Sequence, residues 1–303
     1  MFLKKINKKV AMALMIGIVI PSLSISANAQ EKNNLSVASS EIVFKNSENI
    51  VENEETETVN EYIKLKELSK KTKTELKSLG YNNNDIDLIK KYKDNFKQNI
   101  KDLNDLQNEQ LKSLGYNNSQ IDIIRNFDGS EDQMIKASAN CSVSRSKGSF
   151  YYDKTNQATN LVVNYSFKWN GVPSFRGTDI MAVSNGEFMY FHNNSYLTVS
   201  YSDISNSGAS SSRKILASLD GSGNTGASFK FKTLGNNGLS FARSGSGKAY
   251  LHKKANITQV GVGVKYGHST VTFSPSVSFP AGVSIGFSKN VQSIGPNPIV
   301  CYR

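Results

Sequence analysis

Histidines and carboxylates are the residues that could support acid–base or metal chemistry, and this chain of 303 residues has few of them in its C-terminal half. The only three histidines are His192, His252 and His268. They have no metal-motif spacing such as H-E-x-x-H. The five acids after residue 140 are Asp153, Asp179, Glu187, Asp203 and Asp220. We therefore expect no metal site and no cofactor.

One carboxylate pair could suit glycoside hydrolysis, which needs two carboxylates facing one cleft. Asp179 and Glu187 flank the turn signal Asn185-Gly186 and could face each other across two strands. Such residues more often make surface or turn contacts. The sequence has no G-x-S-x-G motif and no P-loop. We expect a protein that is not an enzyme, with a hydrolase assembled only in space as an open alternative.

Cys141 and Cys301 are the only cysteines, 160 positions apart. In an exported protein such a pair predicts a disulfide. Free or metal-binding thiols are the weaker alternative, because the spacing matches no metal motif. A bond across a loop of this length would stabilise the domain by about 5 kcal/mol in the chain-entropy model.

The N-terminus has the pattern of an export signal. Four lysines precede the apolar run Val10–Ile20, which is too short to span a bilayer. Ala27 and Ala29 form a small-x-small site, so we expect residues 1–29 to be removed after Ala29. An uncleaved anchor is the alternative. The mature protein is expected to be secreted and extracellular, and its composition, rich in lysine and asparagine, suggests a bacterial source.

The net charge of +11 is divided unevenly along the chain. Residues 31–140 contain 16 basic and 20 acidic residues, whereas residues 141–303 contain 16 and 5. An excess of this size favours anionic partners, here a cell-wall polymer, a glycan or a membrane surface. No dedicated nucleic-acid motif is present. The candidate contact residues are Arg213, Lys214, Lys230, Lys232, Lys248, Lys253 and Lys254.

Lys230 and Lys232 alternate with Phe229 and Phe231, which predicts a cationic stripe on the solvent side of a strand. Ordinary solvated lysines that protect a sheet edge are the alternative explanation.

The first part of the mature chain divides into a spacer and a helical segment. Residues 30–58 are polar and acidic and are expected to be a disordered spacer. Residues 59–138 have helical periodicity and two copies of a 35-residue unit, beginning at Leu76 and Leu111. Gly80 and Gly115 are placed to end a helix in the left-handed conformation. Asn83 or Asn84, and Asn118 or Ser119, are the expected N-caps of the next helices, and Ser130 with Gln133 predicts a capping box.

From residue 139 to residue 303 the period changes to two. Leu161–Trp169 alternates apolar and polar residues, and about ten further short runs are separated by turn signals such as Asn170-Gly171 and Ser246-Gly247. This pattern predicts a β-sandwich or partly closed barrel. The expected fold is therefore mixed, with separate domains: a small helical repeat segment, then a basic all-β domain closed by the Cys141–Cys301 disulfide.

The same alternation is also typical of membrane-spanning strands. Val260, Val262 and Val264 alternate with small residues in a run long enough to cross a bilayer. Any half-buried sheet has the same pattern, and we favour that interpretation.

These features together predict a secreted bacterial protein whose basic β-domain binds an anionic or glycan surface. The helical repeats would bind the β-domain or another protein. The alternative is a secreted toxin or antimicrobial protein whose acidic helical pro-region is removed by proteolysis near Ala139.

Overall fold

The computed structural model describes residues 52–204, 210–220, 223–235, 240–269, 275–280 and 282–303. The predicted signal peptide, with Ala27 and Ala29, and most of the predicted spacer lie outside these residues. Within the described ranges, no helix combines the length and apolar character needed to cross a membrane.

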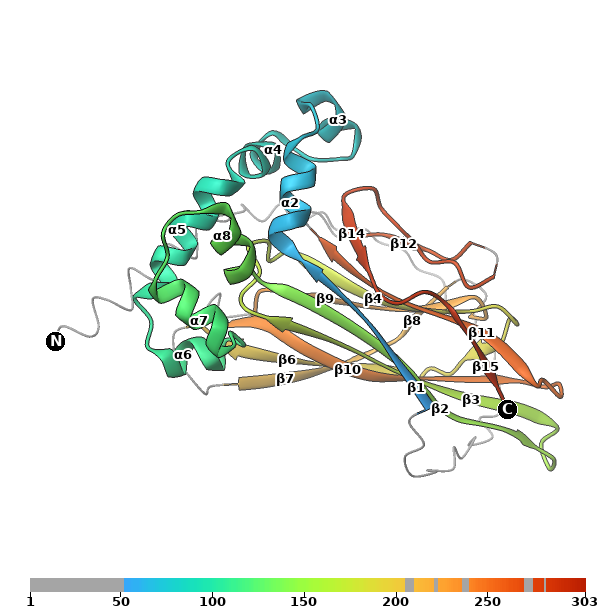
Figure 1. The fold of residues 1–303 in the computed structure, drawn as a ribbon. Helices are drawn as coiled ribbons and strands as arrows, with labels where there is room; N and C mark the ends of the chain where they lie inside the picture. The colour runs from blue at the N-terminus through green and yellow to red at the C-terminus, as the bar shows by residue number, and fades with distance from the viewer. Residues whose placement is uncertain (1–51, 205–209, 221–222, 236–239, 270–274, 281) are drawn as a thin grey trace, which may run out of the picture.

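Two antiparallel sheets form the body of the molecule, and the helices gather at one end (Figure 1). Sheet A has the order β1-β2-β3-β10-β6-β7, with β5 paired to β10. Its strands are β1 (Glu52–Asn60), β2 (Asn140–Asp153), β3 (Ala158–Asn170), β5 (Tyr190–Phe191), β6 (Tyr196–Asp203), β7 (Ser210–Leu216) and β10 (Ser240–Lys253).

Sheet B has the order β14-β11-β4-β9-β8, with β15 paired to β11. Its strands are β4 (Thr178–Asn185), β8 (Ser218–Leu219), β9 (Gly226–Lys232), β11 (Gln259–Ser269), β14 (Val291–Ile294) and β15 (Ile299–Tyr302). A small third sheet pairs β12 (Val277–Ser278) with β13 (Gly286–Phe287). The predicted order of a helical segment followed by a β-domain is confirmed; the sheets of this domain are mostly antiparallel and are not closed.

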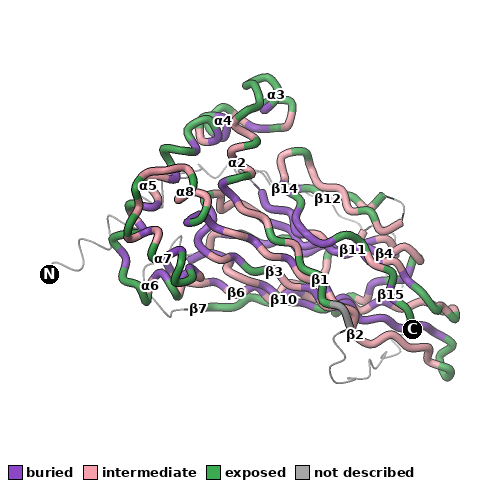
Figure 2. The backbone as a smooth tube through the Cα atoms, in the orientation of Figure 1, coloured by how far each residue is buried: buried purple, intermediate pink, exposed green. Residues whose placement is uncertain are grey.

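The two sheets pack face to face through aromatic side chains. Phe167 of β3 stacks on Phe231 of β9 with ring centroids 5.2 Å apart, and Tyr165 contacts Phe229 at 5.5 Å. All four rings are buried, as the alternation on β3 predicts. Figure 2 shows buried residues concentrated between the sheets, whereas the edge strand β7 is exposed.

Seven helices follow β1 and precede β2. They are α2 (Glu61–Ser69), α3 (Lys73–Ser78), α4 (Asn83–Lys90), α5 (Tyr92–Asn104), α6 (Asn108–Ser113), α7 (Asn118–Arg125) and α8 (Glu131–Ala137). Because β1 pairs with β2, the helical segment is an insertion between two neighbouring strands of sheet A. One hydrophobic cluster runs from Tyr62 to Cys301. The prediction of separate domains is therefore not confirmed.

Residues 52–58 differ from the prediction of a disordered spacer, because they belong to strand β1. The carboxylates of this segment bind the β-domain. Glu55 accepts a hydrogen bond from the buried Arg145 guanidinium at 2.6 Å, and Glu57 accepts one from the Gly295 backbone N–H at 2.7 Å. Arg145 also donates to the Asn297 carbonyl at 2.7 Å. An acidic composition signals solvation in general, but here specific partners lie on β2 and near β14.

The repeat corners fold as the glycine positions predict. Gly80 and Gly115 have φ values of 91° and 96°, in the left-handed region that favours glycine. The next N–H groups, of Tyr81 and Tyr116, donate back to the carbonyls of Leu76 and Leu111. The predicted cap positions were one or two residues late.

The N-caps of α4 and α7 are Asn82 and Asn117, with Asp85 and Gln120 completing capping boxes. Ser130 caps α8 as predicted, but the Gln133 side chain accepts from the Asp128 N–H rather than that of Ser130.

Strand β11 is covered on both faces. Val260, Val262 and Val264 are fully buried in the sandwich. On the opposite face a Cβ added to Gly261 or Gly263 would meet Val283 within 2.8 Å. This burial favours the half-buried sheet over the membrane-strand interpretation.

Two predicted strand boundaries were wrong. Ser246-Gly247 is not a turn but the middle of β10, where Gly247 lies so close to Tyr165 and the Tyr196 carbonyl that a side chain would clash. One of the further alternating runs expected from the sequence, Lys214–Leu219, divides at Ala217, so that β7 joins sheet A and β8 joins sheet B.

The predicted disulfide is absent, and both cysteines are free and buried. Cys141 lies on β2 in sheet A, opposite Trp169 of β3, whereas Cys301 lies on β15 in sheet B, opposite Val260 of β11.

Candidate functional site

Hydroxyl-bearing side chains cover the outer face of sheet A. Tyr165 and Phe167 point inward to sheet B, so their neighbours Asn164 and Ser166 point outward. The register aligns five hydroxyl residues across five strands, which are Thr56, Ser144, Ser166, Ser246 and Thr198. A second row contains Thr58, Ser142, Ser244, Ser200 and Ser212. We call these two rows the hydroxyl face.

The hydroxyl face is regular and accessible. Neighbouring strands lie about 4.8 Å apart, so one row of five spans roughly 19 Å, and the rows are roughly 7 Å apart. The side chains are exposed or half-buried. The Thr56 and Ser144 hydroxyls lie 2.7 Å apart, within hydrogen-bonding distance. Each hydroxyl offers one donor and two acceptor sites, so this pairing leaves capacity for a ligand.

Three lysines accompany the hydroxyl face. Lys214 ends the first row, Lys168 stands within the second, and Lys248 lies beside Asn164 and Tyr196. All three are exposed. The Lys214 ammonium lies 4.4 Å from the centroid of the Tyr196 ring, which holds both side chains in place.

A shallow trough of about 290 Å³ lies in this face. It is lined by Glu54, Ser144, Arg145, Ser146, Asn164, Tyr165, Ser166, Tyr196, Ser246, Gly247 and Lys248. Hydroxyl, amide and phenol groups thus meet in one depression with the carboxylate of Glu54 and the ammonium of Lys248. The hydroxyl, amide and phenol groups can hydrogen-bond a polyhydroxylated molecule, and Lys248 can attract negative charge.

The structure does not bring the seven predicted basic residues together. Lys214 and Lys248 lie on the hydroxyl face, with Arg213 on the edge strand β7. Lys230 and Lys232 lie on sheet B and alternate with the buried Phe229 and Phe231, as predicted. Lys253 and Lys254 lie at the end of β10.

Lys168 is not among the seven predicted contact residues, although its place between Phe167 and Trp169 could have located it on the outer side of β3.

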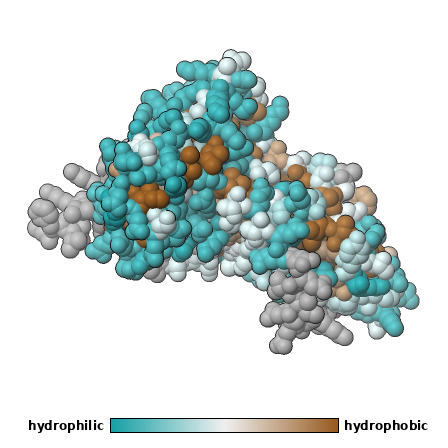
Figure 3. Space-filling model, in the orientation of Figure 1, coloured by the Kyte–Doolittle hydropathy of each residue, from teal (hydrophilic) through white to brown (hydrophobic). Residues whose placement is uncertain are grey.

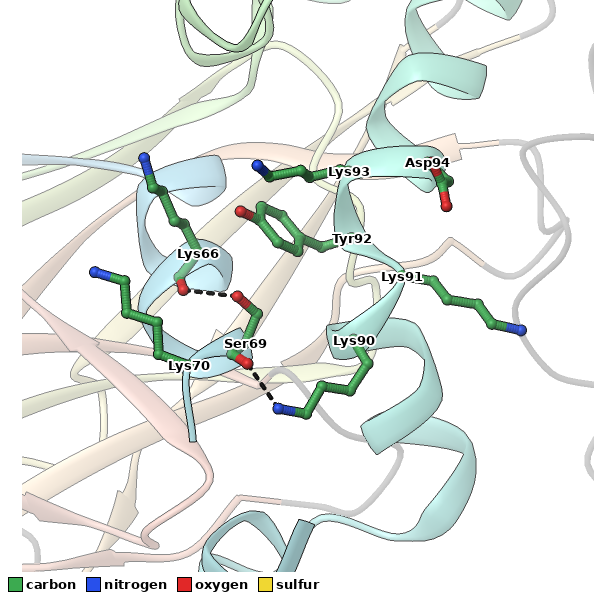
Figure 4. Close-up of a pocket in the computed structure, with 8 residues that line it drawn as sticks. All are labelled: Lys66, Ser69, Lys70, Lys90, Lys91, Tyr92, Lys93 and Asp94. Atoms are coloured by element: carbon green, nitrogen blue, oxygen red, sulfur yellow. Dashed lines mark hydrogen bonds between the residues drawn. The ribbon is translucent and has the colours of Figure 1, made fainter. Parts of the chain in front are cut away.

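A second depression, of about 490 Å³, lies among the helices and contains five lysines (Figure 4). It is lined by Lys66, Ser69, Lys70, Lys90, Lys91, Tyr92, Lys93 and Asp94. Sequence reasoning missed it, because residues 31–140 are acidic in sum.

Local structure accounts for these lysines. The Lys90 ammonium donates to the carbonyls of Ser69 (2.7 Å) and Lys71 at the end of α2. Lys66 and Lys93 both pair with Glu131, at 3.0 and 3.5 Å. Lys66 and Lys90 lie in the last turns of α2 and α4, and cations stabilise helix C-termini, so these lysines have a structural explanation. In Figure 4, Lys91 also points away from Lys66 and Lys70.

A buried acid–base cluster joins helix α2 to sheet B. The His268 Nδ1 lies 3.0 Å from Asp179 Oδ2, and its Nε2 lies 3.9 Å from Glu61 Oε1. The Tyr266 hydroxyl donates to Asp179. Glu61, the first residue of α2, accepts from the backbone N–H groups of Ser174 and Phe175.

The cluster holds a charged histidine in the interior. Burial alone would lower the pKa of His268, but the attraction of Asp179, its hydrogen bond and the attraction of Glu61 raise that pKa to about 10. Burial, with Asp179 and Glu61 nearby, also raises the pKa of the Cys141 thiol. His268, Asp179 and Glu61 are at most 2% exposed. Their contacts hold the start of α2 against sheet B.

The predicted carboxylate pair does not form a cleft. Asp179 lies near the start of β4 inside the buried cluster, whereas Glu187 follows the far end of that strand. Among the described residues, no group of three or more His, Cys, Asp or Glu side chains is arranged to hold a metal ion.

No protein-family model and no curated protein matches the chain. Among solved structures it is similar to one described as a pore forming protein, with 11% identity and a TM-score of 0.27 over 54% of this chain and 85% of that one. It is also similar to Clostridium perfringens delta-toxin, with 10% identity and a TM-score of 0.23 over 55% and 83%. These scores are too low to establish a common fold, and they carry no inference about function.

Proposed function

We propose that the protein binds an anionic polysaccharide, such as a cell-wall polymer, through the hydroxyl face of sheet A. The alignment of ten serine and threonine hydroxyls across the sheet carries this proposal. A flat array with a regular repeat suits an extended, repeating ligand rather than a compact one. Lys168, Lys214 and Lys248 add the attraction for negative charge.

The position of the acidic segment favours this function over a toxin that is activated by proteolysis near Ala139. Ala139 is 2% exposed, and its carbonyl accepts a hydrogen bond from the Glu61 N–H. A protease needs an extended, accessible strand at its cleavage site. Removing residues before 140 would also remove β1, the edge strand of the proposed binding face.

A co-sedimentation assay with an insoluble anionic polysaccharide tests the proposal. The triple variant Lys168→Ser/Lys214→Ser/Lys248→Ser removes the cations of the hydroxyl face. At about 1 kcal/mol for each lysine near a charged surface, affinity should fall roughly 100-fold at low salt. Salt should weaken wild-type binding as well.

The matched control is Lys230→Ser/Lys232→Ser, which removes two exposed cations from sheet B. It should bind nearly as the wild type. Equal losses per charge in both variants would show that net charge alone drives adhesion, and would refute a site on sheet A. A Ser166→Tyr variant tests the flatness of the face independently of charge, because a large ring would stand in the trough.

A further inference from the structure

Exposed hydrophobic side chains gather at the end of the sandwich opposite the helices. Six large hydrophobic residues are exposed in the described part of the chain. Four of them lie at this end: Phe188 (49%), Tyr190 (48%), Val300 (50%) and Tyr302 (62%). Figure 3 shows hydrophobic residues over β11 and β15 near the same end. We call this region the distal end.

Hydrogen bonds join the segments of the distal end into one surface. The Gly186 N–H donates to the Gly261 carbonyl at 2.9 Å, and Gly261 pairs with Val300 on β15. Tyr190 pairs with His252 on β10. The loop before β5 and the C-terminal strand therefore flank the same end of the molecule.

The loop that carries Phe188 is held by buried hydrogen bonds and has a strained backbone at Phe188. The Asn185 side chain accepts from the Met189 N–H at 2.7 Å and donates to the Met189 carbonyl at 3.0 Å. Asn185 and Met189 are almost completely buried. This clamp holds Phe188 at φ 50°, a conformation that a bulky residue rarely adopts. Backbone strain that holds an aromatic ring in solvent suggests a role for that ring outside the fold.

Basic side chains surround these rings. The Lys253 ammonium donates to the Glu187 carbonyl at 2.6 Å, next to Phe188, and the exposed Lys254 follows it. Lys147 reaches the Tyr302 carbonyl at 3.0 Å, and the Arg303 guanidinium lies 5.6 Å from the centroid of the Tyr152 ring.

Aromatic side chains with lysines beside them are the usual anchors of proteins at the membrane–water interface. Anionic headgroups would also attract the strongly basic β-domain. We propose that the distal end docks on an anionic phospholipid surface, with Phe188 and Tyr190 entering the headgroup region.

This contact is separate from the hydroxyl-face site. The test is co-sedimentation of the full secreted chain with vesicles of phosphatidylcholine and phosphatidylglycerol, and with vesicles of phosphatidylcholine alone. The wild type should bind the anionic vesicles more strongly.

The double variant Phe188→Asn/Tyr190→Ser should bind anionic vesicles at least about tenfold more weakly, because two half-exposed rings are lost. Asparagine tolerates a left-handed backbone, so Phe188→Asn alone should have an unchanged or raised melting temperature. A loss of binding without a loss of stability would separate recognition from folding. The matched control, Leu216→Ser, removes an apolar side chain that is 61% exposed on β7 and should bind as the wild type.

Three results would overturn the inference: no vesicle binding by the wild type, normal binding by the double variant, or an equal loss in Leu216→Ser. Binding to polysaccharide without binding to vesicles would refute this inference and leave the proposed function standing.

Discussion

His268 provides the most direct test of how the helices are held to the sheets. The substitution His268→Gln removes the positive charge between Asp179 and Glu61 and leaves two carboxylates in the interior. Removing one partner of a buried ion pair costs about 3–5 kcal/mol. A domain is typically stable by about 5–15 kcal/mol, so a large part of the total stability is at stake.

The wild type should lose stability as the pH rises above about 6.5. The pKa of His268 is raised to about 10 in the folded protein and is about 6.5 in an unfolded chain. The stabilisation is therefore complete below pH 6.5 and disappears as the pH passes through the folded-state value. Between these limits stability falls by about 1.4 kcal/mol per pH unit.

Urea denaturation of the wild type and of His268→Gln at several pH values between 6.5 and 8 measures both effects. This window stays below the titration of the cysteines and tyrosines, some of which also have raised pKa values. The wild type should lose roughly 2 kcal/mol across the window, and His268→Gln should show no such slope. His192→Gln is the control, because that half-buried histidine lies outside the cluster. A flat wild-type profile, or a variant that keeps the slope, would refute the reasoning.

Three further outcomes are expected. Gly115→Ala should lower the free energy of unfolding, measured by thermal denaturation, by about 2 kcal/mol or more, because the added Cβ would lie 3.1 Å from both Arg243 Nε and the Trp169 carbonyl oxygen. The control Gly129→Ala, at φ 86° with nothing within 4 Å of the added Cβ, should lower it by only about 1 kcal/mol. Equal losses in the two variants would contradict the contact at Gly115. Glu55→Gln removes the ion pair with Arg145 and should destabilise β1 by about 1 kcal/mol, a modest value because the half-exposed carboxylate is partly screened by solvent. Amide hydrogen exchange over residues 52–60 should become faster in this variant and stay unchanged in the control Glu54→Gln. In the absence of reductant, both cysteines should react with a thiol reagent in denaturant, and neither should react in the native protein because both are buried. If neither cysteine reacts in denaturant, the two thiols are joined in a disulfide.

Local signals in the sequence predicted local structure well. The alternation in Leu161–Trp169 located the inward residues of β3, and the Gly80 and Gly115 positions located two helix ends. Both features depend on neighbouring residues, through the period of a strand or the backbone freedom of glycine.

The features that the sequence did not reveal depend on distant partners. Residues 52–58 become a strand because β2, more than 80 residues later, offers Arg145 and a free edge. The hydroxyl face needs the register of six strands, which no single run contains. Ser246-Gly247 reads as a turn, yet the glycine is needed for close packing against Tyr165. The two cysteines suggested a disulfide, but they lie on strands of different sheets and are free.

The insertion of the helices between β1 and β2 has a consequence for how the chain folds during synthesis. Translation delivers β1 first, and its pairing partner follows only after the seven helices have been made. The helical contacts are local and can form early, whereas the β1–β2 ladder must wait. An unpaired strand is an aggregation hazard during that delay, and charged side chains are the usual protection. The glutamates of β1 would keep the waiting strand soluble, and two of them, Glu55 and Glu57, then bind the β-domain once it has formed.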